Sequence, residues 1–140
     1  MKVTPMTLQE KIDLFLAGTP HAVVGASVDR NKYGNKVLRA YLQNEMPVYA
    51  INPKASEIEG LPCYADLMSL PTRVHGISII TPPPISESIV DQAAAAGIKH
   101  LWMQPGAESP AAIERADALG LNLIAGDACF LVVKGYHESM

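Results

Sequence analysis

Five short apolar runs, each ended by glycine, proline or another turn-forming residue, alternate with stretches whose apolar residues recur at helical spacing. Short apolar runs bounded by turn residues are typical of buried parallel strands, so the pattern predicts strands joined by helices. The predicted strands are His21–Val24, Val48–Ile51, Ile77–Ile80, Ile98–Met103 and Leu121–Ala125. This alternation favours an α/β fold of three layers, with a doubly wound parallel sheet of about five strands in the middle.

Capping signals mark the starts of the predicted helices. Thr7-Leu8-Gln9-Glu10 has the form of a capping box before the first helix. The helix after the first strand is expected to turn Arg39 to solvent, because its apolar residues mark the opposite face. Ser86 is expected to cap the third helix, and Ser109-Pro110 is a favourable start for the fourth. The last three helices thus each connect two strands, as parallel strands require.

Composition narrows the class of protein. The chain has 140 residues, is 49% hydrophobic and carries a net charge of -3, which suits one globular domain over residues 1–140. This charge gives no support to nucleic-acid binding. No apolar stretch reaches the roughly 18 residues of a membrane span, and Met1-Lys2-Val3-Thr4-Pro5 lacks a signal-peptide core, so no membrane association and a cytoplasmic location are expected. Cys63 and Cys129 lack Cys-x-x-Cys spacing, which favours packing roles.

Turn segments follow all five predicted strands. They are Gly25–Ser27, Asn52–Lys54, Thr81–Pro83, Gln104–Gly106 and Gly126–Cys129. Because the carboxyl ends of parallel strands meet at one edge of the sheet, we expect these segments to line a common crevice. Ligands of open α/β sheets bind in such a crevice, so the sequence predicts a ligand site at this edge.

The first two turns indicate a phosphate-bearing ligand. Gly25, Ala26 and Ser27 are small enough for the backbone to approach an anion, and a helix start follows. The loop lacks the Gly-x-Gly-x-x-Gly fingerprint of dinucleotide folds, but it carries several cations, among them Lys32. Lys54 stands where the dinucleotide fold places an acid. The pair therefore points to a phosphate-rich nucleotide other than NAD.

Several motifs in a fixed order resemble one family. The chain is similar to the small CoA-binding proteins of bacteria and archaea and to the nucleotide domain of the succinyl-CoA synthetase α subunit. The matching motifs are Val24-Gly25-Ala26-Ser27, Lys32-Tyr33-Gly34, Val48-Tyr49-Ala50-Ile51-Asn52-Pro53-Lys54, Gly60-Leu61-Pro62-Cys63-Tyr64, Thr81-Pro82-Pro83 and Trp102-Met103-Gln104-Pro105-Gly106. The resemblance implies a Rossmann-like fold that holds CoA or an acyl-CoA across the strand tips.

The resemblance also implies roles for named residues. It implies that Gly25, Ala26 and Ser27 contact the phosphates and that Lys32 and Lys54 supply positive charge to them. It also implies that Asn52 and Pro53 contact the adenosine end of CoA, and that Thr81, Pro82 and Pro83 contact its pantetheine side. Tyr33, at the rim of the loop, either covers the ligand or packs on its own helix. The chain departs from the family at Val74-His75-Gly76, where an acid is frequent, and at Asp127-Ala128-Cys129, which lacks a basic middle residue.

Catalytic and metal sites are not indicated. The synthetase uses a phosphorylated histidine in another domain, so the resemblance does not extend to ligase activity. Ser27 is not in a Gly-x-Ser-x-Gly elbow. His21, His75, His100 and His137 show no metal-ligand spacing and are expected at strand ends or on the surface.

Three functions remain open at this point. The first hypothesis is a binding or carrier module for CoA or an acyl-CoA, non-catalytic alone, with a homo-oligomer or a partner enzyme left open. The second is an NADP-dependent oxidoreductase, because Lys54 could equally hold a 2′-phosphate. The third is an interaction protein with a vestigial nucleotide site. Nucleotide binding, and the identity of the nucleotide, would discriminate among them.

Overall fold

A seven-stranded sheet, parallel except at one end, runs through the molecule in the order β3-β4-β2-β1-β5-β6-β7. The structure is a computed structural model that describes residues 6–126 and 128–138. The strands are β1 (His21–Val24), β2 (Val48–Ile51), β3 (Glu57–Ile58), β4 (Leu61–Tyr64), β5 (Gly76–Ile79), β6 (His100–Met103) and β7 (Asn122–Ile124). The class expected from the alternation of strands and helices is therefore confirmed.

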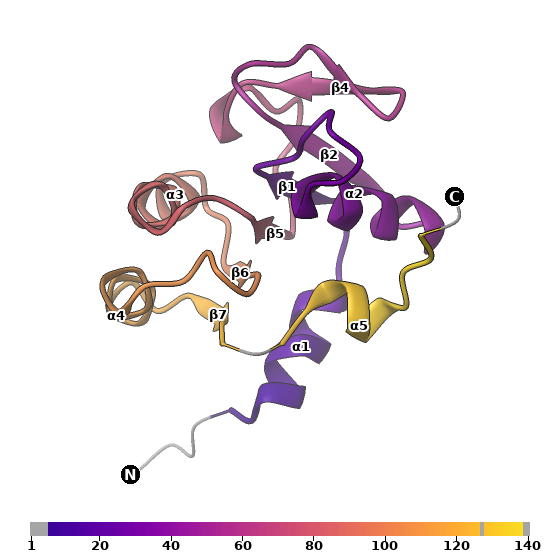
Figure 1. Cartoon of the computed structure of the whole chain (residues 1–140). Helices are drawn as coiled ribbons and strands as arrows, with labels where there is room; N and C mark the ends of the chain where they lie inside the picture. Colours follow the sequence, from indigo (N-terminus) through magenta and orange to yellow (C-terminus); the bar gives the residue numbers. More distant parts are fainter. Residues whose placement is uncertain (1–5, 127, 139–140) are drawn as a thin grey trace, which may run out of the picture.

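Helices cover both faces of the sheet (Figure 1). They are α1 (Leu8–Leu16), α2 (Tyr33–Gln43), α3 (Pro83–Ala95), α4 (Pro110–Ala118) and α5 (Phe130–Lys134), with a short 3-10 turn, η1 (Leu67–Ser69). One face packs α3 and α4 against the sheet, and the other packs α1, α2 and α5. Within the described residues, no helix combines the length and the apolar character that a membrane span needs.

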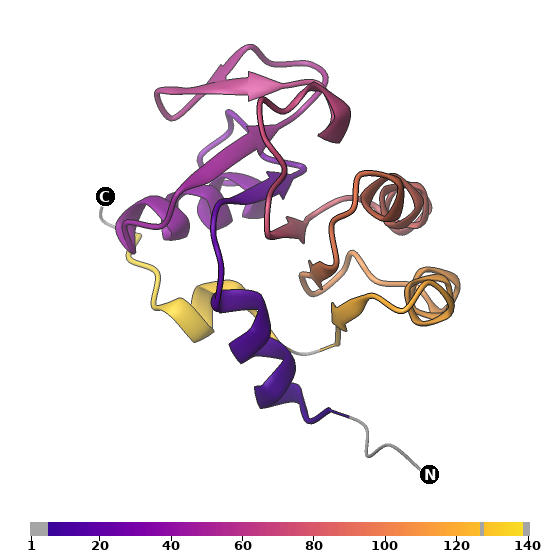
Figure 2. The same cartoon turned by 180° about the vertical axis from the view of Figure 1, so that it is seen from behind.

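Two apolar clusters form the core, one on each face. Ile77, Ile79 and Leu101 pack under α3 and α4, while Phe15, Trp102 and Phe130 join α1 and α5 on the other face. Phe15 and Phe130 each meet Trp102 edge to face, with ring centroids 5.3 Å and 5.6 Å away. Trp102 is fully buried, and α1 and α5 consequently lie side by side (Figure 2).

The sheet has two more strands than the expected five, because the sequence pattern missed the β3–β4 hairpin. Pro62 within β4 argues against a strand, yet it lies opposite Glu57 in an antiparallel pair at the end of the sheet. Glu59 and Gly60 form the two-residue turn, and both have positive φ, 50° and 80°. The helix α5 was missed as well, since five residues carry little periodicity.

Two helix expectations were wrong. The N-cap of α3 is Pro82, and Ser86 lies inside the first turn, where its hydroxyl bonds the Thr81 hydroxyl at 2.8 Å. Proline starts the helix because its missing N–H costs nothing there. Arg39 is buried rather than exposed, since its Nε donates to the Asn35 side chain at 2.7 Å and its Nη2 to the Arg30 carbonyl at 2.8 Å. The capping box at Thr7 and the Ser109 cap are confirmed.

Three histidines stack at the amino-terminal edge of the sheet. His21 begins β1, His75 precedes β5 and His100 begins β6, so the strand-end expectation holds for all three. The ring centroids of His75 and His100 lie 4.4 Å apart, and those of His21 and His75 lie 5.9 Å apart. His21 is fully buried against Tyr41, whose hydroxyl lies 3.0 Å from Nδ1. This edge is opposite the one where a ligand is expected.

Candidate functional site

The strand order places a crevice beside β1. From β1 the chain crosses over to β2 on one side, and β5 pairs with β1 on the other side. The carboxyl ends of β1 and β5 are therefore where the winding direction reverses, and open α/β sheets bind ligands at such a point. The loops that start at Gly25 and Ile80 face each other there.

Two cavities meet in this crevice. The first, which we call the loop cavity, has a volume of about 380 Å³ and is lined by Gly25, Ala26, Ser27, Lys32, Tyr33, Gly34, Asn52 and Ile80. The second, the α3 cavity, has about 330 Å³ and extends along α3, with Pro53, Thr81, Pro82, Ile85 and Ile89 in its lining. Both cavities share Gly25, Asn52 and Ile80. Together they form one site with two compartments.

Close backbone contacts shape the loop cavity. Gly25 has a φ of 96°, and a Cβ there would lie 2.3 Å from the Ile80 carbonyl oxygen. Gly34 has an ordinary helical position in the first turn of α2, but a Cβ there would lie 2.0 Å from the Gly25 carbonyl oxygen. Glycine at both positions lets the β1 loop, the β5 loop and the start of α2 approach one another.

Two buried or half-buried amides brace the loop. The Asn52 side chain donates to the Ala26 carbonyl at 2.8 Å, and the Asn35 side chain donates to the Ser27 carbonyl at 2.8 Å. The Ser27 hydroxyl accepts the Asp29 N–H at 3.1 Å. These bonds within the fold fix the path of residues 26–29.

The start of α2 supplies hydrogen-bond donors to the loop cavity. The N–H groups of Gly25 and Ala26 both bond the Ile51 carbonyl, at 3.1 Å and 3.3 Å, and are therefore occupied inside the fold. The N–H groups of Tyr33 and Gly34 have no acceptor within the described part of the chain, and the N-cap Lys32 provides no side-chain cap. A helix start with open N–H groups favours an anion.

Charge is distributed unevenly over the two compartments. Lys32 lines the loop cavity, whereas Lys54 is exposed and lines neither cavity, with its N–H bonded to the Asn52 side chain at 2.8 Å. Asp66 lines the α3 cavity. Hydrogen bonds from the Ser69 hydroxyl and N–H hold the pKa of its carboxyl below the usual value. Among the residues that line the two cavities, the cation, Lys32, thus lies in the loop cavity and the acid, Asp66, in the α3 cavity.

The α3 cavity has apolar walls. Ile85 and Ile89 face it from α3, one turn apart, and Ile80 closes it from the β5 loop. Thr81 and Pro82 belong to the lining as the sequence suggested, but Pro83, the first residue of α3, does not. Such a compartment suits the apolar part of an elongated ligand.

Tyr33 lines the loop cavity, and its hydroxyl bonds residues outside its own helix. These partners are the Gln104 side chain, at 3.4 Å, and the Cys129 thiol. Burial, and next the hydrogen bond to Cys129, raises the pKa of the Tyr33 hydroxyl well above the usual value. Gln104 and Cys129 thereby support the site from behind Tyr33, while Pro105 and Gly106 line neither compartment. Asp127 lies outside the described residues.

Comparison with known sequences decides the family. The profile described as CoA binding domain matches residues 20–135 of this chain. The chain belongs to the CoA binding domain family. Both cavities, and every residue assigned above to their lining, fall inside the matched range.

Relatives of this family member include much longer enzymes. The ADP-forming acetate–CoA ligase I of Archaeoglobus fulgidus is 28% identical over 113 residues, which cover 74% of this chain and 16% of the ligase. The ADP-forming acetate–CoA ligase II of the same organism is 32% identical over 95 residues, which cover 66% of this chain and 14% of that ligase. This chain therefore spans about one seventh to one sixth of the length of these relatives.

Solved structures repeat the same fold. A conserved hypothetical protein from Pyrococcus furiosus is 38% identical, with a TM-score of 0.77 over 81% of this chain and 97% of its own. The dinucleotide-forming acetyl-coenzyme A synthetase 1 of Ca. Korarchaeum cryptofilum, in complex with phosphate and ADP, is 31% identical. Its TM-score is 0.68 over 76% of this chain and 25% of that one. The family fold thus occurs both in a protein of similar size and within a larger synthetase.

Sequence reasoning missed several residues of the site. Gly34 was quoted in a motif without a role, although an isolated glycine in a helical pattern is a recognisable signal. Ile85 lines the α3 cavity one turn before Ile89, a spacing that the sequence displays. Asp66 carried no signal, because its place depends on the unpredicted β4 and η1. Among the described residues, no group of three or more histidine, cysteine or acidic residues could hold a metal ion.

Proposed function

We propose that residues 1–140 form a single domain that binds CoA or an acyl-CoA and acts as a binding or carrier module without catalysis of its own. One observation carries the proposal. A cation-bearing cavity at the start of α2 meets an apolar cavity along α3 at Gly25, Asn52 and Ile80. CoA combines phosphates with a long and less polar arm, and the two compartments suit these two parts. Family membership supports the same ligand.

The phosphates have a defined set of candidate partners. Tyr33 and Gly34 offer N–H groups at a helix start, and the Ser27 hydroxyl can donate while it accepts from Asp29. Lys32 adds charge at the cavity lining, and Lys54 adds charge from an exposed position that a phosphate outside the cavities would meet. Gly25 and Ala26 would let the backbone lie close to a phosphate, but their N–H groups already bond the Ile51 carbonyl and would not donate to it.

The remaining contacts divide between the ends of the ligand. Asn52 and Pro53 are proposed to contact the adenosine end, and Thr81, Pro82 and Pro83 the pantetheine side. Ile80, Ile85 and Ile89 extend the apolar wall beside Pro82, which supports this placement of the arm. Pro83 stands outside the cavity lining, so its part would be to fix the start of α3.

A binding role without chemistry agrees with the groups around the site. Ser27 is bonded to a backbone N–H, and the three stacked histidines lie at the opposite edge of the sheet. A partner enzyme would then use the bound acyl-CoA, whether the chain acts as a single copy or as a homo-oligomer. The free cysteines Cys63 and Cys129 agree with a reducing, cytoplasmic setting.

Calorimetric titration of the purified protein with CoA, acetyl-CoA, NADP and NAD tests the proposal. We expect CoA or acetyl-CoA to bind at least about tenfold more tightly than NADP, a difference of about 1.4 kcal/mol. A preference for NADP would instead favour an oxidoreductase that uses Lys54 for the 2′-phosphate. Absence of binding to all four would favour an interaction protein.

A pair of lysine variants makes the titration specific to the site. Lys32→Ala should weaken CoA binding roughly tenfold or more, because a charge-assisted hydrogen bond to phosphate is lost. Lys99→Ala removes the same charge beside β6 at the amino-terminal edge and should leave affinity within about twofold. Equal losses in both variants would indicate an effect of net charge alone and would contradict the proposed phosphate site.

A further inference from the structure

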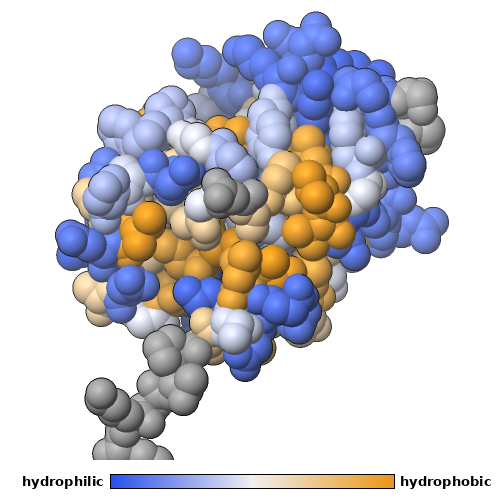
Figure 3. Space-filling view, turned by 60° about the horizontal axis from the view of Figure 1, so that its bottom comes forward, coloured by the Kyte–Doolittle hydropathy of each residue, from blue (hydrophilic) through white to orange (hydrophobic). Residues whose placement is uncertain are grey.

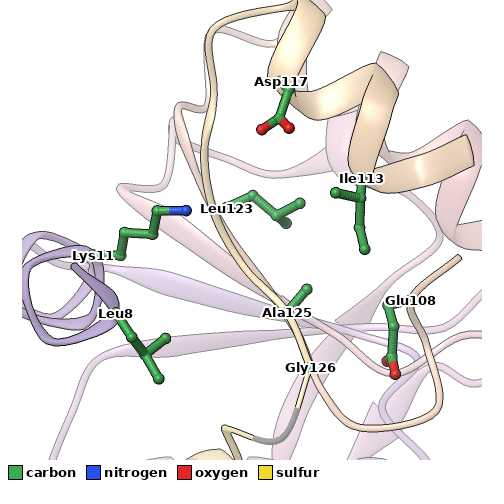
Figure 4. A pocket seen from close by; sticks show the side chains of 8 residues that line it. All are labelled: Leu8, Lys11, Glu108, Ile113, Asp117, Leu123, Ala125 and Gly126. Atoms are coloured by element: carbon green, nitrogen blue, oxygen red, sulfur yellow. The ribbon is translucent and has the colours of Figure 1, made fainter. Parts of the chain in front are cut away.

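A third cavity lies outside the edge strand β7, away from the site described above. We call it the edge groove; it has a volume of about 340 Å³. Figure 4 shows its lining, with Leu8 and Lys11 from α1, Ile113 and Asp117 from α4, Glu108 from the loop before α4, and Leu123, Ala125 and Gly126 at and after β7. It shares no residue with the loop cavity or the α3 cavity.

The floor of the edge groove presents unpaired backbone. β7 pairs with β6, and the ladder includes the Asn122 N–H donating to the Lys99 carbonyl at 2.8 Å. In a parallel pair every second residue bonds the neighbouring strand, so Asn122 and Ile124 face β6 while Leu123 and Ala125 turn their N–H and C=O groups outward. Within the described chain no strand pairs with this side of β7.

The two walls of the groove differ in charge. Lys11 extends from α1 on one side, and Asp117 and Glu108 extend from the α4 side (Figure 4). Leu8 and Ile113 supply an apolar surface on each wall. The end of the molecule formed by α1 and α5 is also rich in apolar side chains (Figure 3), among them the exposed Leu14 and Val132.

We propose that the edge groove binds an extended segment of another protein, which pairs with β7 as an additional strand. The outward groups of Leu123 and Ala125 would give the backbone hydrogen bonds. Side chains of an added strand alternate between faces, so basic side chains would point to Asp117 and Glu108, and apolar ones would cover Leu8 of α1. The occupant is thus a segment that alternates basic and apolar residues.

Charge argues against a second copy of this chain as the occupant. A two-fold axis that pairs β7 with β7 in antiparallel fashion runs perpendicular to the sheet. The α1 wall of one copy then lies beside the α1 wall of the other, and the α4 wall beside the α4 wall. Lys11 would then face the same lysine, and Asp117 the same aspartate. Like charges across an added strand are unfavourable, whereas a basic segment neutralises the α4 wall.

The test uses the full chain and a synthetic eight-residue peptide of alternating lysine and valine. Hydrogen exchange of single amides is followed by NMR with and without saturating peptide. The Leu123 and Ala125 amides should exchange about tenfold more slowly with peptide, while those of Asn122 and Ile124 stay slow throughout, because β6 already binds them. Binding without slower exchange at Leu123 and Ala125 would overturn the proposal.

Two controls separate strand pairing from attraction by net charge. A peptide with the same eight residues in two blocks, lysines then valines, cannot place its lysines on one face and should bind several-fold more weakly. Asp117→Lys should weaken the alternating peptide about threefold to tenfold, while Glu114→Lys, the same charge change on α4 outside the groove lining, should change it less than about twofold.

Equal binding of the two peptides, or equal effects of the two variants, would overturn the proposal in favour of unspecific attraction. Sedimentation of the protein without peptide tests whether a second copy of this chain occupies the groove. We expect it to show no association through β7. A dimer whose Leu123 and Ala125 amides are protected without peptide, and lose protection on dilution, would assign the groove to a second copy and would also overturn the proposal.

Discussion

Gly34 lies with its Cα directly against the carbonyl oxygen of Gly25, so that a Cβ at position 34 would come within 2.0 Å of that oxygen. The contact joins the first turn of α2 to the end of β1. It brings the open N–H groups of Tyr33 and Gly34 to the loop cavity, where they meet Lys32 and Ser27. The geometry of the proposed phosphate site therefore depends on glycine, which has no Cβ, at position 34.

Gly34→Ala should lower CoA affinity at least about tenfold and lower the melting temperature. Alanine favours a helix over glycine by about 1 kcal/mol, so propensity alone would stabilise α2. A fall in both CoA affinity and melting temperature would therefore reflect the steric conflict with the Gly25 carbonyl oxygen. This backbone oxygen can move away from the new Cβ only if the whole loop moves. Titration with CoA and thermal unfolding measure the two effects. Unchanged affinity with a raised melting temperature would show that the loop moves freely and does not form the phosphate site.

Gly25→Ala should destabilise the protein more than Gly106→Ala. The two glycines have nearly equal φ, 96° and 98°, so both variants carry similar backbone strain, of the order of 1–3 kcal/mol. A Cβ at position 25 would also lie 2.3 Å from the Ile80 oxygen, whereas nothing lies within 4 Å of one at position 106. Urea unfolding should therefore give a free-energy loss at least about 1 kcal/mol larger for Gly25→Ala. Equal losses would contradict the close contact of the β1 and β5 loops.

The sequence predicted the parts of the fold that rest on apolar periodicity and capping. β1 and β2 begin and end at the expected residues, and the capping box at Thr7 forms as its spacing requires. The β3–β4 hairpin was missed because its strands are short and Pro62 weakens their signal. Arg39 was misplaced because a helical face shows where apolar residues gather and not which polar ones find buried partners.

The candidate site divides in the same way. Turns after buried strands must lie at the carboxyl edge, so most residues assigned to it by the sequence do line the two cavities. Two residues with an assigned ligand role, Lys54 and Pro83, line neither cavity, since the exact reach of a loop depends on its turn geometry. The expectation of one crevice for all five turns was also wrong, because no described residue of Gln104–Gly106 or Gly126–Cys129 lines either cavity. The bonds of the Gly25 and Ala26 N–H groups could not be foreseen, because their acceptor, the Ile51 carbonyl, lies at the end of the neighbouring strand β2.

CoA affinity should fall as salt concentration rises. The cations proposed to meet phosphate, Lys32 and Lys54, are exposed, and such charges are screened over roughly 8 to 10 Å near physiological ionic strength. Titrations at low and high sodium chloride should show this fall for the parent protein and a smaller one for Lys32→Ala. Equal affinity of the parent at both concentrations would mean that the apolar α3 cavity carries the binding.

His21 takes part in a hydrogen-bond chain that fits the neutral imidazole ring. Its Nε2 donates to the Gly18 carbonyl at 2.7 Å, so in the neutral ring Nδ1 must accept, and the Tyr41 hydroxyl donates to it at 3.0 Å. Tyr41 in turn lies 2.9 Å from the Ser78 hydroxyl, which then donates to Tyr41. Burial, with repulsion from His75 and His100 as a smaller cause, lowers the pKa of His21 from 6.5 to about 4.

Stability should consequently decrease in acid, and His21→Gln should weaken that dependence. Between pH 6.5 and about 4 the unfolded imidazole binds a proton that the folded one does not, so the unfolding free energy is full above pH 6.5 and falls toward pH 4. For this one group the fall is at most roughly 3 kcal/mol. Glutamine can donate to the Gly18 carbonyl but does not titrate, so urea unfolding from pH 7.5 to 4 should give a flatter profile for His21→Gln. The exposed His137→Gln should keep the slope of the parent. If His21→Gln and the parent lose the same free energy over this range, the buried histidine is not the source of acid sensitivity.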